Sequence, residues 1–132
     1  GVLFLFYQGE IMATLKELET YIDYEFSSGV ITGKDYLQFQ TKYINYIKAI
    51  CKQNGWIVEN IGRNHYTFSL FITNNKGKYV YLSISDVRGW YNEWYERVLV
   101  RYALHNKHYS GGKNQYTSLP MLEQKLQQML EN

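Results

Sequence analysis

The spacing of apolar residues changes near Trp56, and this change constrains the fold more than any other feature of the sequence. Before Trp56, apolar side chains recur every three or four residues, which places them on one face of a helix. After Trp56, apolar and polar residues alternate in short runs that are separated by turn-forming residues, which is typical of strands. A chain of 132 residues has room for one core. The helices and strands are therefore expected to pack together in a single α+β domain.

Two helices are predicted before Trp56. Thr14 and Glu17 have the spacing of a capping box, and Ser27-Ser28-Gly29 ends the helix that they open. A second box, Thr32 with Asp35, opens a longer helix that ends at Asn54-Gly55. The first helix is predicted to bury Leu15, Leu18, Ile22 and Phe26, and the second to bury Tyr36, Leu37, Tyr43, Ile44, Ile47, Ile50 and Cys51.

Four antiparallel strands in meander order are predicted over residues 56–62, 65–72, 78–85 and 95–103. The polar residues 105–117 form a connection to a last helix, which begins at Ser118 with Pro120 in its first turn. The fold class is therefore α+β, with two amino-terminal helices, a four-stranded antiparallel sheet and a carboxy-terminal helix. We expect the helices to cover one face of the sheet.

The alternation of side chains assigns each strand residue to one of the two faces. The face toward the helices is predicted to comprise Tyr66, Phe68, Leu70, Ile72, Val80, Leu82, Ile84, Val98, Val100 and Tyr102. The opposite face is predicted to carry Phe71, Tyr79, Tyr81, Tyr95, Arg97 and Arg101. This second face is expected to be either exposed or buried in an oligomer.

Aromatic residues interleaved with arginines are typical of sheets that bind single-stranded nucleic acid, where stacking contributes about 1–3 kcal/mol per base. The same residues are common in protein interfaces, and tyrosine is also frequent on ordinary sheet surfaces. Lys107 and Lys113 lie in the following loop, where Gly111-Gly112 and these lysines together could hold a phosphate, although the spacing differs from a Walker loop. The predicted residues for binding nucleic acid or a protein partner are thus Phe71, Tyr79, Tyr81, Tyr95, Arg97, Arg101, Lys107 and Lys113.

The sequence indicates neither an enzyme nor a metal or cofactor site. His105 and His108 have no third ligand nearby, and Cys51 falls on an apolar stripe without a partner base. Trp90 and Trp94 are expected to close the edge of the core. The net charge of +2 is modest for a nucleic-acid-binding protein. No apolar run reaches the roughly 20 residues of a membrane span, and the lone cysteine suits a reducing compartment, so we predict a cytoplasmic protein.

Residues 1–11 are predicted to be a translated leader or an accessory segment that precedes a domain of residues 12–132. In an AT-rich genome, the codons for Gln8-Gly9-Glu10 would contain a ribosome-binding sequence shortly before the codon of Met12. The alternative is a genuine β-strand over Val2–Tyr7, since these residues have strong strand propensity.

Several segments resemble small uncharacterised proteins of prophages and integrative or conjugative elements in Gram-positive bacteria. The resemblance covers roughly residues 56–130 and rests on Tyr79–Arg88, Trp94, Val98–Ala103 and Tyr109–Asn114. It implies an accessory role on a mobile element, with no activity to carry over. The order of helices and strands also resembles double-stranded-RNA-binding domains, but the last helix has a single lysine, Lys125, where those domains place a basic cluster. We therefore expect a non-catalytic protein that binds nucleic acid through the second sheet face. The alternative is a protein-interaction module, either a homodimer or an inhibitor of a host protein, that uses the same face.

Overall fold

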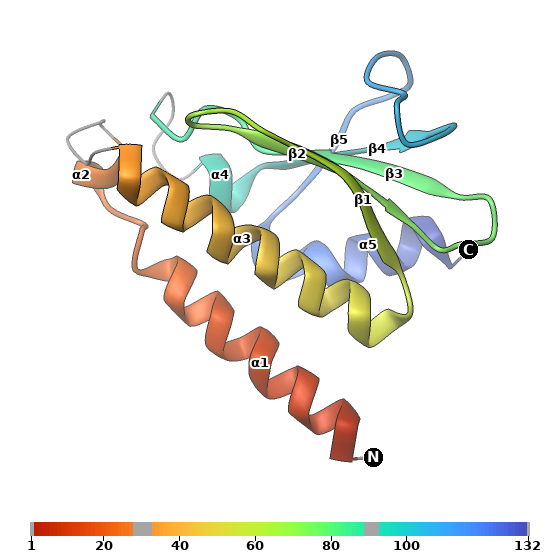
Figure 1. The fold of residues 1–132 in the computed structure, drawn as a ribbon, viewed down its shortest axis with the longest axis horizontal. Coiled ribbons are helices and arrows are strands. Elements are labelled where there is room, and N and C mark those ends of the chain that lie inside the picture. Colours follow the sequence, from red (N-terminus) through yellow and green to blue (C-terminus); the bar gives the residue numbers. More distant parts are fainter. Residues whose placement is uncertain (1, 28–32, 89–92, 132) are drawn as a thin grey trace.

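The computed structural model describes residues 2–27, 33–88 and 93–131, which form one antiparallel sheet with helices on one side (Figure 1). In chain order the elements are α1 (Val2–Glu19), α2 (Tyr24–Ser27), α3 (Gly33–Asn54), β1 (Ile57–Arg63), β2 (Phe68–Thr73), β3 (Tyr79–Ser83), α4 (Glu93–Glu96), β4 (Val98–Ala103), β5 (Gln115–Thr117), the 3₁₀ helix η1 (Leu119–Met121) and α5 (Leu122–Leu130). The predicted α+β class is confirmed.

The sheet has five strands in the order β1-β2-β3-β4-β5, so each strand pairs with its neighbours in sequence. The predicted meander is correct, but the predicted number of strands is one too low. The additional strand, β5, lies within residues that we predicted to be a loop, and it pairs Tyr116 with Leu99. With only three residues, β5 is too short to show a period of 2.

The fourth predicted strand begins later than expected. Residues Glu93–Glu96 form a single helical turn, α4, in which the backbone N–H of Arg97 donates to the carbonyl of Glu93 at 2.8 Å. The strand β4 therefore starts at Val98, and Tyr95 is not a sheet residue. The prediction that residues 95–97 continue the alternating pattern of the strand is therefore wrong.

Helix α1 begins well before the predicted start at Thr14. The Thr14 hydroxyl donates to the carbonyl of Glu10 at 2.9 Å inside the helix, so it does not cap an amino terminus. The helix also ends earlier than predicted, at Glu19, and Phe26 belongs to α2. The alternative prediction of a strand over Val2–Tyr7 is wrong, whereas a translation start at Met12 stays a prediction. Among the helices that the structure describes, none combines the length and apolar character needed to cross a membrane.

Helix α3 ends as predicted, with Gly55 in a left-handed conformation at φ +76°. Thr32, the predicted cap, lies outside the described residues. The buried stripe includes all of the predicted residues except Leu37, which is exposed, and it also includes Phe39 and Tyr46. Because Tyr36, Phe39 and Tyr43 follow the helical spacing of three to four residues, Leu37 falls outside the stripe.

The core lies between the sheet and the helices, and the alternation predicted it well. Trp94 is fully buried in this core, with its ring 4.6 Å from that of Phe39, while Trp90 falls outside the described residues. Tyr102 is exposed, contrary to the prediction, because it lies past the last residue of β4 that pairs with β5. The other residues predicted to face the helices are buried, apart from the half-buried Tyr66: Phe68, Leu70, Ile72, Val80, Leu82, Ile84, Val98 and Val100.

Candidate binding face of the sheet

The side of the sheet that faces away from the helices, here called the outer face, carries most of the predicted binding residues. The register places Phe71 directly opposite Tyr81, and Tyr81 directly opposite Arg101. Directly paired residues share a face. The three side chains therefore form one row across β2, β3 and β4, as the alternation predicts. A second row consists of Ser69, Ser83, Leu99 and Tyr116.

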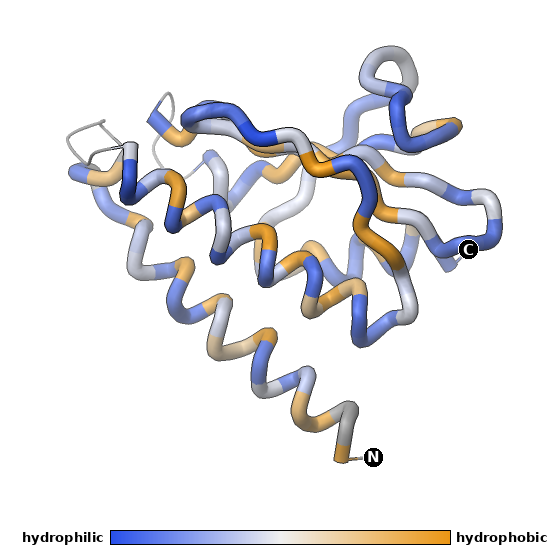
Figure 2. The backbone as a smooth tube through the Cα atoms, in the orientation of Figure 1, coloured by the Kyte–Doolittle hydropathy of each residue, from blue (hydrophilic) through white to orange (hydrophobic). Residues whose placement is uncertain are grey.

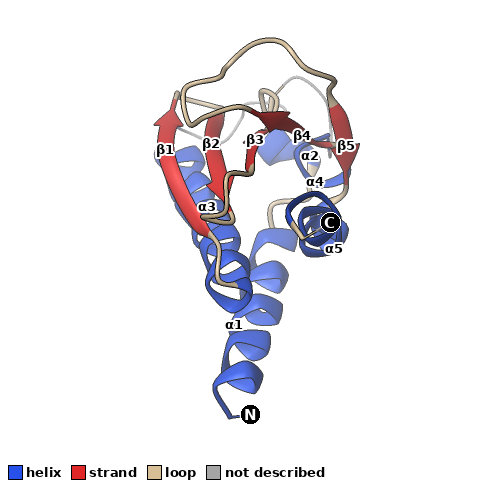
Figure 3. Cartoon of the chain, turned by 90° about the vertical axis from the view of Figure 1, so that its right-hand side faces the viewer, coloured by secondary structure: helices blue, strands red, loops and turns tan. Residues whose placement is uncertain are grey.

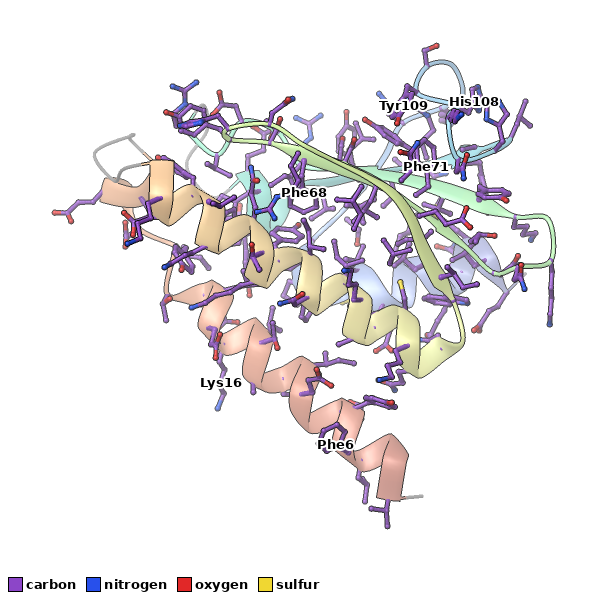
Figure 4. The ribbon with its side chains drawn as sticks, in the orientation of Figure 1. Phe6, Lys16, Phe68, Phe71, His108 and Tyr109 are labelled. Atoms are coloured by element: carbon purple, nitrogen blue, oxygen red, sulfur yellow. The ribbon has the colours of Figure 1, made fainter. Side chains whose placement is uncertain are left out.

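The first row is covered by residues 104–114, here called the cover loop, which crosses the outer face between β4 and β5 (Figure 3). The ring of Tyr109 packs 5.3 Å from that of Phe71 and 6.1 Å from that of Tyr81. Figure 4 shows Tyr109 and His108 above Phe71. As a result Phe71 is fully buried and Arg101 is only 6% exposed. We expected this face to be exposed or buried in an oligomer, but the chain buries this half of it by itself.

A bulge in β1 holds the cover loop in place. The register between β1 and β2 shifts between Glu59 and Gly62, and Asn60 in this bulge has a φ of +51°. Its side-chain amide donates to the carbonyl of Asn106 at 2.7 Å and to the hydroxyl of Tyr109 at 2.9 Å. A bulge redirects a side chain, and asparagine tolerates a positive φ better than most residues. Asn60 therefore links the far edge of the sheet to the loop.

Replacing Asn60 by glycine is expected to loosen the cover loop without straining β1. Glycine keeps the positive φ but removes both hydrogen bonds, each of which contributes about 0.5–1.5 kcal/mol. Amide hydrogen exchange in residues 104–109 should accelerate roughly tenfold. Asn75→Gly is the matched control, because Asn75 also has a positive φ, at +59°, but lies in the hairpin between β2 and β3. Equal exchange in the wild type and the Asn60→Gly variant would contradict this account.

Arg101 is a buried cation whose described surroundings hold no pairing carboxylate. Its guanidinium lies 4.5 Å from the Tyr81 ring, and Nη2 donates to the carbonyl of His108 at 3.2 Å. The Nε atom is buried, and no acceptor for it lies among the described residues. Gly112 packs on the arginine stem, since a Cβ at this position would lie 3.2 Å from Cδ. Within the described ranges, the partners of this positive charge are therefore neutral.

The other predicted residues lie in different places. Tyr95 is separate from the outer face, because its hydroxyl donates to the Glu19 carboxylate of α1 at 2.9 Å. Burial, followed by this hydrogen bond, raises the pKa of Tyr95 to about 12. Tyr79 is half-buried on the outer face, while Lys107 and Lys113 are exposed on the cover loop. The prediction that Tyr95 shares a face with Tyr81 is therefore wrong.

The second row forms an open half of the outer face, and an arginine stacked on a tyrosine marks its edge. The Arg97 guanidinium lies 4.1 Å from the ring of Tyr116, and Tyr116 is 46% exposed. The same guanidinium pairs with the Glu93 carboxylate at 3.5 Å. Beside this pair is a hollow of ≈ 170 Å³, and a second hollow of ≈ 390 Å³ lies beside Tyr81. Ser83 lines both hollows. Sequence reasoning missed Tyr116, although Tyr116-Thr117 just before the predicted cap at Ser118 is a strand-favouring pair.

The positive charge of the chain is concentrated in the sheet and its loops. Residues 57–118 contain eight Lys or Arg and four Asp or Glu, a net charge of +4, whereas the rest of the chain has six and eight, a net charge of −2. Arg97, Arg101, Lys107 and Lys113 all belong to the outer face or its cover loop. The small net charge of the whole chain is therefore the sum of a basic half, which holds the sheet, and an acidic half, which holds most of the helices.

The histidines of the cover loop act as acceptors for its own backbone. The Nδ1 atom of His108 accepts from the N–H of Leu104 at 3.0 Å, and that of His105 accepts from the N–H of Lys107 at 3.1 Å. Their rings are 5.7 Å apart. Within the described ranges, no group of three or more His, Cys, Asp and Glu residues is arranged to hold a metal ion.

No family model matches this chain, and neither a curated protein nor a solved structure is significantly similar to it.

Proposed function

We propose that this protein is a non-catalytic binding protein that contacts single-stranded nucleic acid through the open half of its outer face. The observation that carries the proposal is the exposed pair of Arg97 and Tyr116, 4.1 Å apart, within the basic half of the chain. An exposed aromatic ring can stack on a base at about 1–3 kcal/mol, and an adjacent arginine can bind a phosphate or extend the stack. A place on a bacterial mobile element, as the resemblance implies, is part of the same proposal.

The chemistry of the open half favours nucleic acid over a protein partner. Ser69 and Ser83 contribute hydroxyl groups, and Leu99 is only half-buried between them and Tyr116. The centre of a protein interface is ordinarily apolar and poor in charge. The open half instead carries hydroxyls, one tyrosine and one arginine, whose partner Glu93 lies at 3.5 Å and would have to yield to a phosphate. Such a surface suits a ligand that is itself charged and aromatic.

The cover loop supplies additional positive charge next to this surface. Lys107 and Lys113 are exposed on it, and Arg101 lies beneath it without a carboxylate partner in the described part of the chain. A nucleic-acid backbone that leaves the Arg97–Tyr116 pair along the sheet would pass these cations. Phosphate contacts of this kind are sequence-independent and weaken with salt.

The Arg97→Ala variant is expected to bind single-stranded oligonucleotides about five- to tenfold more weakly than the wild type. Loss of one phosphate contact should also reduce the slope of log K against log salt by roughly one. Fluorescence anisotropy of labelled oligonucleotides of about 12 nucleotides, a length within the usual site size, measures both quantities. Tyr116→Ala should weaken binding at every salt concentration, because it removes stacking and not charge.

Arg88→Ala is the matched control for this experiment. Arg88 is also an exposed arginine over a tyrosine, 3.5 Å from the ring of Tyr66, and like Arg97, which pairs with Glu93 at 3.5 Å, it pairs with an acidic residue, Asp86, at 2.8 Å. Tyr66 in turn packs edge-on against Tyr36 of α3, which places Arg88 away from the outer face. Equal weakening by both arginine variants, or no binding by the wild type at low salt, would contradict the proposal. The second result would favour a protein partner for this face.

A further inference from the structure

Helix α1 is apolar on two opposite faces. Ile11 and Leu18 are buried toward α3, with Leu15 packed beside them. On the other side of the same helix, four large apolar side chains are mostly exposed: Val2 (86%), Leu5 (69%), Phe6 (65%) and Met12 (54%). A surface helix normally presents polar residues on the side away from its core, and a helix that is apolar all round is normally buried.

The exposed side of α1 is accessible along its whole length. The amino-terminal half of the helix extends away from the rest of the fold (Figures 1 and 3), and apolar positions continue toward its first residue (Figure 2). Apart from its chain neighbours and the nearby helix backbone, no described atom lies within 4 Å of the Cβ position at Gly9, in the middle of this side. Lys16, which points away from α3 in Figure 4, ends this side, and the exposed Glu10, one turn after Phe6, flanks it. Between Val2 and Lys16 the exposed side consists of Val2, Leu5, Phe6, Gly9, Met12 and Ala13.

The area of this patch is large enough for a small specific interface. A fully exposed aromatic side chain presents roughly 150–250 Å², and Leu, Met and Val lie toward the lower end of this range. The four exposed fractions therefore amount to roughly 400–500 Å² in one copy, within the roughly 300–600 Å² of the largest apolar patch on a typical monomer, a patch that is often functional. Two such patches together would bury about 800–1,000 Å², which reaches the lower limit for a specific protein–protein interface.

We propose that this face of α1 binds the same face of a second copy of the chain, with the two helices antiparallel and crossing at Gly9. A two-fold axis at Gly9 brings Phe6 of one copy against Met12 of the other, which is a favourable aromatic–thioether contact. A parallel pair would instead place the two Lys16 ammonium groups side by side. The proposal involves no residue of the outer face and is independent of the proposed nucleic-acid function. It requires residues 2–9, and so it competes with the predicted translation start at Met12.

Sedimentation equilibrium tests the association directly. At about 100 µM the wild type is expected to show twice its chain mass of 15.7 kDa, and Phe6→Glu should show the mass of a single chain. Leu104→Glu is the matched control, because Leu104 is also an exposed apolar residue, at 79%, but lies on the cover loop. Circular dichroism verifies that each variant is folded. A wild type of 15.7 kDa at this concentration, or a dimer that persists in Phe6→Glu, would overturn the proposal.

Cysteine cross-linking tests the direction of the two helices. The single native cysteine, Cys51, is 1% exposed, so an introduced thiol is the accessible one. With diamide as the oxidant, two Gly9→Cys chains should form one disulfide, since the crossing point brings equivalent residues together. Lys16→Cys chains should not cross-link, because an antiparallel pair separates these positions. Cross-linking of Lys16→Cys together with Gly9→Cys would overturn the antiparallel arrangement, because a parallel pair brings equivalent residues together at both positions. Oligonucleotide binding by Phe6→Glu should match the wild type, which separates this test from that of the proposed function.

Discussion

Replacing Phe71 by alanine is expected to lower the free energy of unfolding by about 3–5 kcal/mol, the cost of truncating a phenylalanine in a packed core. Alternation places Phe71 on the side of the sheet away from the helices, where such a change would ordinarily cost less than about 1 kcal/mol. Its side chain is nevertheless fully buried between Tyr81 and Tyr109. Equilibrium denaturation in urea at neutral pH measures the difference.

Two further variants show whether the cover loop causes this loss. Tyr116→Ala removes an aromatic residue from the open half of the same face and should cost less than about 1 kcal/mol. Tyr109→Ala removes the ring above Phe71, and the double variant should be less destabilised than the sum of the two single variants by about 0.5–1.5 kcal/mol. A loss in Phe71→Ala as small as that in Tyr116→Ala would show that the loop leaves Phe71 exposed.

The cover loop also determines which aromatic residues a ligand can reach. While Tyr109 rests on Phe71 and Tyr81, it occupies the position where a base would stack on them, so the exposed aromatic ring among the strands of this face is that of Tyr116. A ligand that used Phe71 would first have to displace the loop and its hydrogen bonds to Asn60. Under the proposed binding mode, Asn60→Gly therefore leaves oligonucleotide affinity unchanged, whereas a ligand of Phe71 would bind this variant more tightly.

The parts of the fold that the sequence predicts well are those with dense periodic patterns. Helix α3 and the hairpin of β2 and β3 have apolar residues at nearly every expected position, and Asn75 and Gly77 adopt the positive φ that their turn requires. Prediction fails where two patterns meet. Tyr95 continues the alternation of β4 backward, but residues 93–96 form a helical turn, and a turn this short leaves no period of its own. Thr14 and Glu17 match a capping box, yet the apolar residues before them continue the same helix.

The candidate site was predictable in its composition but not in its accessibility. Alternation shows which side of the sheet carries Phe71, but it says nothing of what lies above that side. The burial depends on contacts between residues far apart in sequence, such as Asn60 with Asn106, that no periodicity encodes. The available signal was the sequence Asn60-Ile61-Gly62 inside a predicted strand, because asparagine and glycine at such positions indicate a bulge.

The stability of the protein is expected to fall steeply above pH 9, since several buried groups must ionise when the chain unfolds. Burial raises the pKa of the Cys51 thiol from 9.0 to about 12. Burial, with a smaller contribution from Tyr46, raises the pKa of Tyr43 well above 10.0. Burial, followed by the charge of Glu123, likewise raises that of Tyr46. The hydroxyls of both tyrosines donate to backbone carbonyls, those of Trp94 and Leu119, so the folded core requires them protonated.

Stability falls with rising pH because the unfolded chain releases these protons at a lower pH than the folded chain does. Below pH 9 both states hold these protons, and the stability is fully present. Above pH 9 for Cys51, and above pH 10 for the tyrosines, the unfolded chain binds fewer protons than the folded one, so each group lowers the free energy of unfolding by about 1.4 kcal/mol per pH unit. By pH 11 the combined loss is about 5 kcal/mol, which is comparable with the whole stability of many domains.

The variant Cys51→Ala separates the thiol from the tyrosines. It should be somewhat less stable than the wild type at neutral pH because it leaves a small cavity, but its stability should stay constant up to about pH 10. Urea denaturation at pH 8, 9, 10 and 11 measures both curves. If the wild type and Cys51→Ala lose stability in parallel between pH 9 and pH 10, the thiol is not the group that titrates first. If the free energy of unfolding of the wild type does not fall before pH 11, then Tyr43 and Tyr46 ionise in the folded core as readily as in water.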